Sequence, residues 1–521
     1  MALKSSQRGT GNSGGVDVGA APADLKGVVF TGVLWKSGTR VVAEGTRFVL
    51  VLILARLLTP TDYGVAGMAL VATSFVGLFT DPALGAALIQ RPTIDERDRS
   101  TVFWMAVGIG TLLTIVGVAT SGAVASFFGE PQVQNLFIVT SLCFFITSLA
   151  VAHRALLTRQ LAYRSLEIRE MASIITGAAV AITFAVAGAG PWAIVSNFVA
   201  YSLMTTVLAW LLLDWRPRAR FSLDSARSLS GFSTRVFAAT LLSWGNQNLD
   251  NTLVGRFLGA PALGTYALAY NSMQTPRRLV AGTVNQAVNP VFSRIQSDKP
   301  RLERAFVRTR RLSVALVAPC LLGIIIVAPD VVPVAFGHQW HAAILPLQLL
   351  CLGGIAVSLN TLNWSVLQAS GEARALLRLT LLESAITWSA FVAGLPWGIV
   401  GVSAFYAGAR WLLVLPETWM SARATSFGFW ACLRAGGDML LIALVAAAIA
   451  FASRELLLDT GVSVVVRLAL VAAVMTGAYA VLLSLVTPSL LREIWQVARF
   501  RSLRTPGAAL QTSSNGESNA L

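Results

Sequence analysis

Residues 312–336 read LSVALVAPCLLGIIIVAPDVVPVAF and contain one charged residue, Asp330. This run is long enough to cross the hydrocarbon core of a bilayer, which takes about 20 residues of α-helix. The segment before it is basic, with Lys299, Arg301, Arg304, Arg308, Arg310 and Arg311. No Lys or Arg follows up to residue 341. Positive charge on one side only is typical of a membrane-spanning helix whose basic end lies in the cytoplasm.

The chain as a whole is also rich in hydrophobic residues and poor in charged ones. Of its 521 residues, 55% are hydrophobic and 12% charged, and the mean hydropathy is +0.68. About a quarter of the residues of a soluble domain are charged. About fourteen spans would take about 280 residues, which leaves little for a globular domain. This excludes a soluble catalytic module on an anchor, and the lack of apolar–polar alternation argues against an outer-membrane barrel.

Apolar runs between turn signals predict an all-α polytopic membrane protein of about fourteen transmembrane helices. The expected spans are residues 28–57, 64–90, 100–128, 133–153, 170–188, 191–213, 232–258, 262–293, 312–336, 342–369, 377–394, 397–421, 437–453 and 463–486.

The connections between spans alternate in charge. Those after even-numbered spans are rich in Arg and Lys, whereas segments 128–131, 188–191, 329–341 and 394–397 contain neither. The positive-inside rule therefore places the even connections and both termini in the cytoplasm. It also explains the net charge of +15 without nucleic acid as a partner.

An internal repeat appears when the chain is shifted by about 200 residues. Five residues match five others: Gly45, Arg56, Leu58, Gly64 and Ala69 fall on Gly245, Arg256, Leu258, Gly264 and Ala269. The repeat predicts two related lobes in parallel orientation. Transporters use this arrangement and bind the substrate between the lobes. The expected divisions are a disordered cytoplasmic tail at 1–27, an N-terminal lobe at 28–213, a cytoplasmic linker at 214–231, a C-terminal lobe at 232–421, an extra helix pair at 437–486 and a cytoplasmic tail at 487–521.

Charged residues within the first span form a polar ladder. Lys36, Arg40, Glu44 and Arg47 fall within an arc of about 80° and climb about 16 Å along the helix. Charges at membrane depth face a cavity or a partner. The face therefore either lines a lumen for an anionic substrate, or it is locked structurally by Glu44 pairing with Arg40 or Arg47.

Spans seven and eight carry long polar faces. The candidate substrate-binding residues here are Arg235, Asn246, Asn248, Asn271, Gln274, Arg278 and Asn285. They line a wet cavity, or their amides join helices without a substrate. Glu44, Asp250 and Asp81 are the candidates for coupling to an ion, and Glu383 and Arg410 are further polar residues within spans.

No enzyme-type site is found in the sequence, and no cofactor is expected. His338 and His341 lack a third metal ligand nearby, and no phosphate-binding loop occurs. The four cysteines form no C-x-x-C pair, so neither a disulfide nor a metal site is predicted.

Three segments carry a resemblance to a known family. They are Leu54-Ala-Arg-Leu-Leu-Thr-Pro-Thr-Asp-Tyr-Gly64, Asp81-Pro-Ala-Leu-Gly-Ala-Ala-Leu-Ile-Gln-Arg91 and Asn289-Pro-Val-Phe-Ser-Arg-Ile-Gln296. They resemble bacterial Wzx-like polysaccharide flippases of the multidrug/oligosaccharidyl-lipid/polysaccharide superfamily. The similar branch includes the colanic acid, succinoglycan and teichuronic acid translocases.

The resemblance implies a flippase, not an enzyme, with a MATE-like fold. It would move undecaprenyl-diphosphate-linked oligosaccharide repeat units by alternating access, driven by an H⁺ or Na⁺ gradient. The expected partners are that substrate, membrane lipid, and a polysaccharide polymerase with its export machinery. The alternatives are a lipid II flippase or a drug/cation antiporter of the same superfamily, and a membrane enzyme or scaffold of polysaccharide assembly.

Overall fold

The computed structural model describes residues 25–80, 85, 88–89, 91, 94–222 and 234–487, without the side chains of 25–38, 40–41, 234–237, 280–290 and 293. Within these ranges the regular structure is entirely helical, which confirms the predicted all-α class. The helices are α1 (Leu25–Leu57), α2 (Pro60–Val76), α4 (Glu96–Phe128), α5 (Gln132–Ser148), α6 (Val151–Arg159), α7 (Tyr163–Val186), α8 (Trp192–Leu212), α10 (Thr234–Ile295), α11 (Lys299–Val331), α12 (Ile344–Ala369), α13 (Ala373–Gly394), α14 (Gly398–Thr425), α15 (Phe429–Leu458) and α16 (Val464–Val486). Short helical turns are η1 (Gly77–Phe79), η2 (Val332–Phe336), η3 (His338–Ala343) and η4 (Leu395–Trp397).

The described helices are those of a multi-pass membrane protein. Nine segments are long and apolar enough to cross a membrane, or ten if the bent pair α5–α6 is one span. The polar helices α1 and α10 are not among these segments, and one segment, Ala373–Thr425, contains both α13 and α14. In the described part of the chain, each expected span corresponds to one helix when α10 is divided at Gly259 and α5 is joined to α6. For the span 64–90 this holds for α2, and most of the span's residues after 80 lie outside the described ones.

Several helices begin well before the apolar runs, which corrects the expected boundaries. Helix α11 starts at Lys299 and α7 at Tyr163. Arg164 and Arg169 therefore lie within α7 rather than in a connection. Arg, Glu and Leu are good helix formers, so a helix can continue past the end of its apolar stretch.

Local sequence signals set where a helix begins and where one breaks. At the α1–α2 turn, the Thr59 hydroxyl accepts a hydrogen bond from the Asp62 amide at 3.2 Å, and the Asp62 carboxylate accepts one from the Thr59 amide at 2.9 Å. This capping box, with Pro60 at the first helical position, starts α2 sharply. In α10, Gly259 has φ +83° and breaks the helix into two arms, a conformation that glycine adopts readily.

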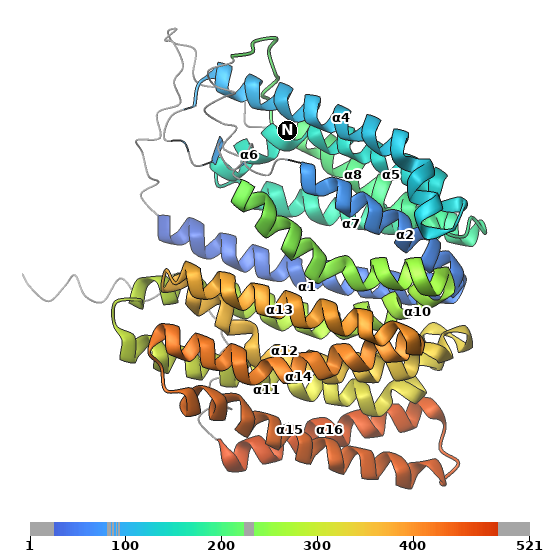
Figure 1. Cartoon of the computed structure of the whole chain (residues 1–521), viewed down its shortest axis with the longest axis vertical. Coiled ribbons are helices and arrows are strands. Elements are labelled where there is room, and N and C mark those ends of the chain that lie inside the picture. The colour runs from blue at the N-terminus through green and yellow to red at the C-terminus, as the bar shows by residue number, and fades with distance from the viewer. Residues whose placement is uncertain are drawn as a thin grey trace, which may run out of the picture.

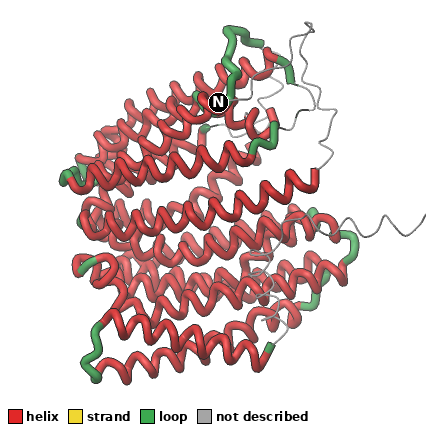
Figure 2. The backbone as a smooth tube through the Cα atoms, turned by 180° about the vertical axis from the view of Figure 1, so that it is seen from behind, coloured by secondary structure: helices red, strands yellow, loops and turns green. Residues whose placement is uncertain are grey.

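The helices run side by side, with their connections at two opposite ends (Figure 2). In Figure 1, α4, α5, α7 and α8 lie on one side of α1, and α11 to α16 lie on the other. The end that holds the α1–α2 turn is called the turn end below. There the indole of the fully buried Trp340 donates to the Ala55 carbonyl at 2.7 Å, and Arg56 Nε donates to the Ala335 carbonyl at 3.1 Å.

Helices α2 and α10 also cross at the turn end, through a symmetric contact. A β-carbon on Gly64 would lie 1.8 Å from the Ala260 carbonyl oxygen, and one on Gly264 would lie 1.9 Å from the Pro60 carbonyl oxygen. Gly64 and Gly264 are matched residues of the sequence repeat, and Pro60 and Ala260 are separated by the same interval. The two repeats thus meet through equivalent backbone segments, and only glycine permits this approach.

Candidate functional site

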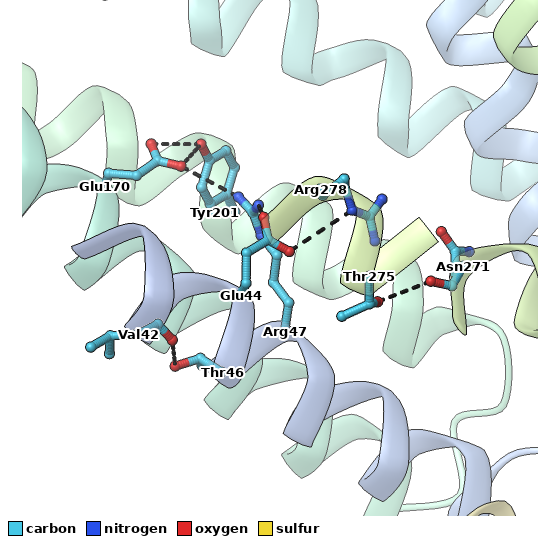
Figure 3. A network of polar contacts seen from close by, with 9 residues as sticks. All are labelled: Val42, Glu44, Thr46, Arg47, Glu170, Tyr201, Asn271, Thr275 and Arg278. Atoms are coloured by element: carbon cyan, nitrogen blue, oxygen red, sulfur yellow. Dashed lines mark hydrogen bonds and ion pairs between the residues drawn. The ribbon is translucent and has the colours of Figure 1, made fainter. Parts of the chain in front are cut away.

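A network of ion pairs and hydrogen bonds joins α1 to α7, α8 and α10 (Figure 3). Glu44 of α1 is buried, at 7% exposure. Its carboxylate lies 3.1 Å from Arg47 on the same helix and 3.9 Å from Arg278 Nε on the second arm of α10. A buried carboxylate requires such partners, because an unpaired charge at this depth is costly.

The network continues from Arg47 to α7 and α8. A second nitrogen of Arg47 lies 3.5 Å from the Glu170 carboxylate, and the Tyr201 hydroxyl donates to both Glu170 oxygens at 2.9 Å. Glu44, Arg47, Glu170, Tyr201 and Arg278 are called the central network below. The negative charges of Glu44 and Glu170 balance the positive charges of Arg47 and Arg278. The Arg47 side chain remains 50% exposed.

The pairing of Glu44 with Arg47, which belongs to one of the two alternatives for this face, is present, and Arg278 meets Glu44 from a distant part of the sequence. Glu170 and Tyr201 were not predicted as site residues, because Glu170 stands at the expected start of a span and Tyr201 in an apolar run. The local signal near them is a cluster of charged residues, Glu167, Arg169 and Glu170.

The predicted amides of α10 lie along both of its arms. Asn271 is exposed and donates to the Ala267 carbonyl, Asn248 donates to the Trp244 carbonyl, and Gln274 donates to the Tyr270 hydroxyl at 3.1 Å. The buried Oδ1 of Asn246 has no hydrogen-bond partner among the described residues. Among the predicted α10 residues whose side chains are described, Arg278 alone joins the central network.

Asp250 lies apart from the central network, inside the packed C-terminal helices. It is 1% exposed, and its carboxylate accepts hydrogen bonds from the Tyr266 hydroxyl at 3.0 Å and the Asn251 amide at 2.7 Å. Within the described chain, no Lys or Arg lies within ion-pair distance of it. The two further candidates, Glu383 and Arg410, pair with each other between α13 and α14.

Five of the candidates cannot be placed. The side chains of Lys36, Arg40, Arg235 and Asn285 lie outside the described residues, and so does Asp81 as a whole. His338 and His341 lie in η3. No group of three or more metal-ligating side chains occurs in the part of the chain that the structure describes.

Comparison with known sequences finds a matching family and full-length relatives. Residues 53–345, more than half of the chain, match a family described as polysaccharide biosynthesis protein. The succinoglycan biosynthesis transport protein ExoT of Rhizobium meliloti is 26% identical, over 91% of this chain and 96% of that protein. The lipopolysaccharide biosynthesis protein WzxC of Escherichia coli is 26% identical, over 67% and 71%. The teichuronic acid biosynthesis protein TuaB of Bacillus subtilis is 26% identical, over 74% and 82%.

Solved structures of similar fold are membrane transporters. The lipid II flippase MurJ in an inward closed conformation superposes with a TM-score of 0.69 at 14% identity, over 87% of this chain and all of that one. An inward-facing multidrug resistance MATE transporter gives 0.54 at 16% identity, over 79% and 96%. At these identities the likeness concerns the fold alone, and it agrees with the expected MATE-like arrangement.

Proposed function

This chain belongs to the polysaccharide biosynthesis protein family, and from that premise we propose that it is a flippase for undecaprenyl-diphosphate-linked oligosaccharide repeat units. It would move them across the bacterial inner membrane during exopolysaccharide, capsule or lipopolysaccharide biosynthesis. The observation that carries the proposal is the family match over residues 53–345. The relatives that are named as polysaccharide biosynthesis or transport proteins support it.

Translocation would proceed by alternating access of two lobes, residues 28–213 and 232–421. Residues 437–486 form an extra pair, and 214–231 a linker. The symmetric contact of Gly64 and Gly264 supports two related lobes that meet at one end. The charge alternation supports cytoplasmic termini, so the turn end would face the periplasm. The conformation described would then be closed on the periplasmic side.

The central network would receive the charged part of the substrate. Guanidinium groups form strong hydrogen bonds with phosphate oxygens. Arg47 is half exposed although it is paired, so a diphosphate could displace its contact with Glu170. Lys36 and Arg40 would extend the cationic face, and the amides of α10 (Asn246, Asn248, Asn271, Gln274 and Asn285) and Arg235 would meet sugar hydroxyls. The prenyl chain would remain in the membrane lipid.

We expect Arg47→Ala to reduce polysaccharide secretion about 10- to 100-fold, because one hydrogen bond to a charged group contributes about 1.5–3 kcal/mol. Secretion and membrane abundance of the protein would be measured together. The control is Arg97→Ala, which removes an exposed cation from the first turn of α4. Normal secretion by Arg47→Ala, or failure only because the protein disappears, would favour a structural role for the ion pair.

Reconstituted liposomes separate this proposal from its alternatives. Lipid-linked repeat units, lipid II and a cationic drug would be offered to the same preparation. Transport of the repeat unit alone supports the proposal. Transport of lipid II would favour a lipid II flippase, and transport of the drug would favour a drug/cation antiporter. Transport of none would favour an enzyme or a scaffold that acts beside a polymerase.

We further propose that Asp250 couples transport to an H⁺ or Na⁺ gradient. Its carboxylate forms no ion pair with a basic side chain in the described chain, which supports this role over Glu44, whose carboxylate pairs with two arginines. Asp81 is the remaining candidate. In vesicles with an imposed gradient, Asp250→Asn should make translocation independent of the gradient while substrate binding survives. Unchanged gradient dependence in this variant would assign coupling to another group.

A further inference from the structure

A polar cavity lies among the N-terminal helices. Its volume is about 350 Å³, and it is lined by α4, α5, α6, α7 and α8 together with Thr80 and Gly85, beside the 44° bend between α5 and α6. Its lining includes Thr147, Arg154, Arg169, Glu170, Tyr201 and Thr205. Glu170 and Tyr201 also belong to the central network, so the cavity adjoins that network. The space is called the N-terminal cavity below.

Arg169 is the unusual residue of this cavity. It is 6% exposed, and its Nε and Nη1 have no hydrogen-bond partner among the residues that the structure describes. A buried guanidinium with unused donors is costly, and buried polar groups are almost always hydrogen-bonded. The Thr205 hydroxyl, which also lines the cavity, is buried and unpartnered as well.

No described side chain accepts a hydrogen bond from Nε or Nη1 of Arg169. Glu170 is the next residue, but its carboxylate accepts from the Tyr201 hydroxyl and pairs with Arg47. The other charged group on the lining is Arg154, a second cation. Two positive charges on one small cavity repel each other. An anion bound between them would be attracted to both and so offset the repulsion.

The side chains that line the cavity indicate which class of ligand it could bind. The planar guanidinium fork matches a carboxylate through two parallel hydrogen bonds. Hydroxyls of Thr147, Thr205 and Thr206 line the same cavity, and Phe144 and Ile109 supply an apolar wall. The Thr147 and Thr206 hydroxyls donate to backbone carbonyls and keep their lone pairs as acceptors. Ligand cavities range from about 300 to 1,000 Å³, so this one holds a small ligand and not a whole lipid-linked oligosaccharide.

We propose that the N-terminal cavity is a binding site for a sugar carboxylate, with Arg169 as its principal ligand and Arg154 and Thr205 as additional contacts. The carboxylate comes from an acidic sugar of the translocated repeat unit or from a free sugar acid. The first source rests on the proposed flippase function. The binding site itself does not.

The first experiment measures binding without transport. Purified full-length protein would be titrated with glucuronate and with glucose at constant ionic strength, and the shift of the thermal unfolding midpoint recorded. We expect a saturable upward shift with glucuronate only. Arg169→Gln should remove it, Thr205→Val should weaken binding several-fold, and the exposed-cation control Arg97→Gln should retain it.

Several outcomes would overturn the site. They are equal shifts with glucose and glucuronate, no shift with either, or wild-type glucuronate affinity in Arg169→Gln. If Arg169→Gln does not fold, Thr205→Val and Arg169→Lys serve instead, since both preserve most of the side-chain volume. Undiminished binding in both would then overturn the proposal.

Transport distinguishes the two sources. Liposomes would receive lipid-linked repeat units that differ only in one uronate or its neutral hexose. If the repeat unit supplies the carboxylate, Arg169→Gln should slow the acidic substrate about tenfold or more and leave the neutral one unchanged. Unchanged transport of both, with glucuronate binding lost, identifies a free sugar acid as the ligand. A wild-type protein that binds glucuronate but moves neither substrate contradicts the flippase function and not the site.

Discussion

Replacing Gly64 and Gly264 together by alanine is expected to reduce polysaccharide export by up to about 100-fold while the protein still folds. Each added β-carbon would lie within 2 Å of a carbonyl oxygen of the opposing helix, so α2 and α10 must separate. Overpacking costs about 1–3 kcal/mol, occasionally more, and a tenfold change in a conformational equilibrium needs about 1.4 kcal/mol. The conformation in which the turn end is closed would then be less populated than the open one.

Distance measurements test this expectation directly. Spin labels would be placed at Gln132, the exposed first residue of α5, and at Asp459, an exposed residue of the turn after α15. These two helices lie on opposite sides of the bundle (Figure 1), and the distance between the labels would be measured in a cysteine-free background. The double variant should show longer distances. Gly122→Ala is the matched control, because a β-carbon there meets nothing within 4 Å and the substitution within α4 should stabilise the helix by about 1 kcal/mol. Unchanged distances and normal export in the double variant would exclude closure through these glycines.

Asp330→Asn is expected to destabilise the protein by about 3–5 kcal/mol, the cost of breaking a buried ion pair. Asp330 of α11 is 8% exposed, and its carboxylate pairs with Arg454 of α15 at 2.8 Å and with Arg467 of α16. It therefore joins the last two helices to the rest of the bundle. Neutralising it would leave two largely buried guanidinium groups without their shared partner.

Thermal stability of the detergent-solubilised protein measures this effect. The control is Asp438→Asn, which removes another α11–α15 ion pair, Arg311–Asp438 at 2.7 Å, whose side chains are about one third exposed. Exposed pairs contribute about 0–1 kcal/mol, so the control should unfold close to the wild-type temperature. Equal midpoints for the two variants would show that the Asp330 pairs do not hold α15 and α16 in place.

The sequence was sufficient for the fold class and the family. The run at 312–336 predicted a span and lies in α11 and η2, because a bilayer selects apolar stretches of a set length whatever their neighbours are. The shift of about 200 residues likewise marked Gly64 and Gly264 as equivalent. Periodicity also placed Glu44 and Arg47 on one face of α1, since side-chain direction along a helix is a local property.

Only the tertiary structure decided which faces meet. It brought Arg47 to Glu170 and Glu44 to Arg278, it made Gly64 and Gly264 two sides of one crossing, and it placed Arg169 at a cavity. In a soluble helix the apolar stripe indicates the buried face, but in a membrane both lipid and core are apolar, so this signal is lost. Helix association there depends on close packing and on a few polar contacts. These join residues more than a hundred positions apart, and no local pattern in the chain records their partners.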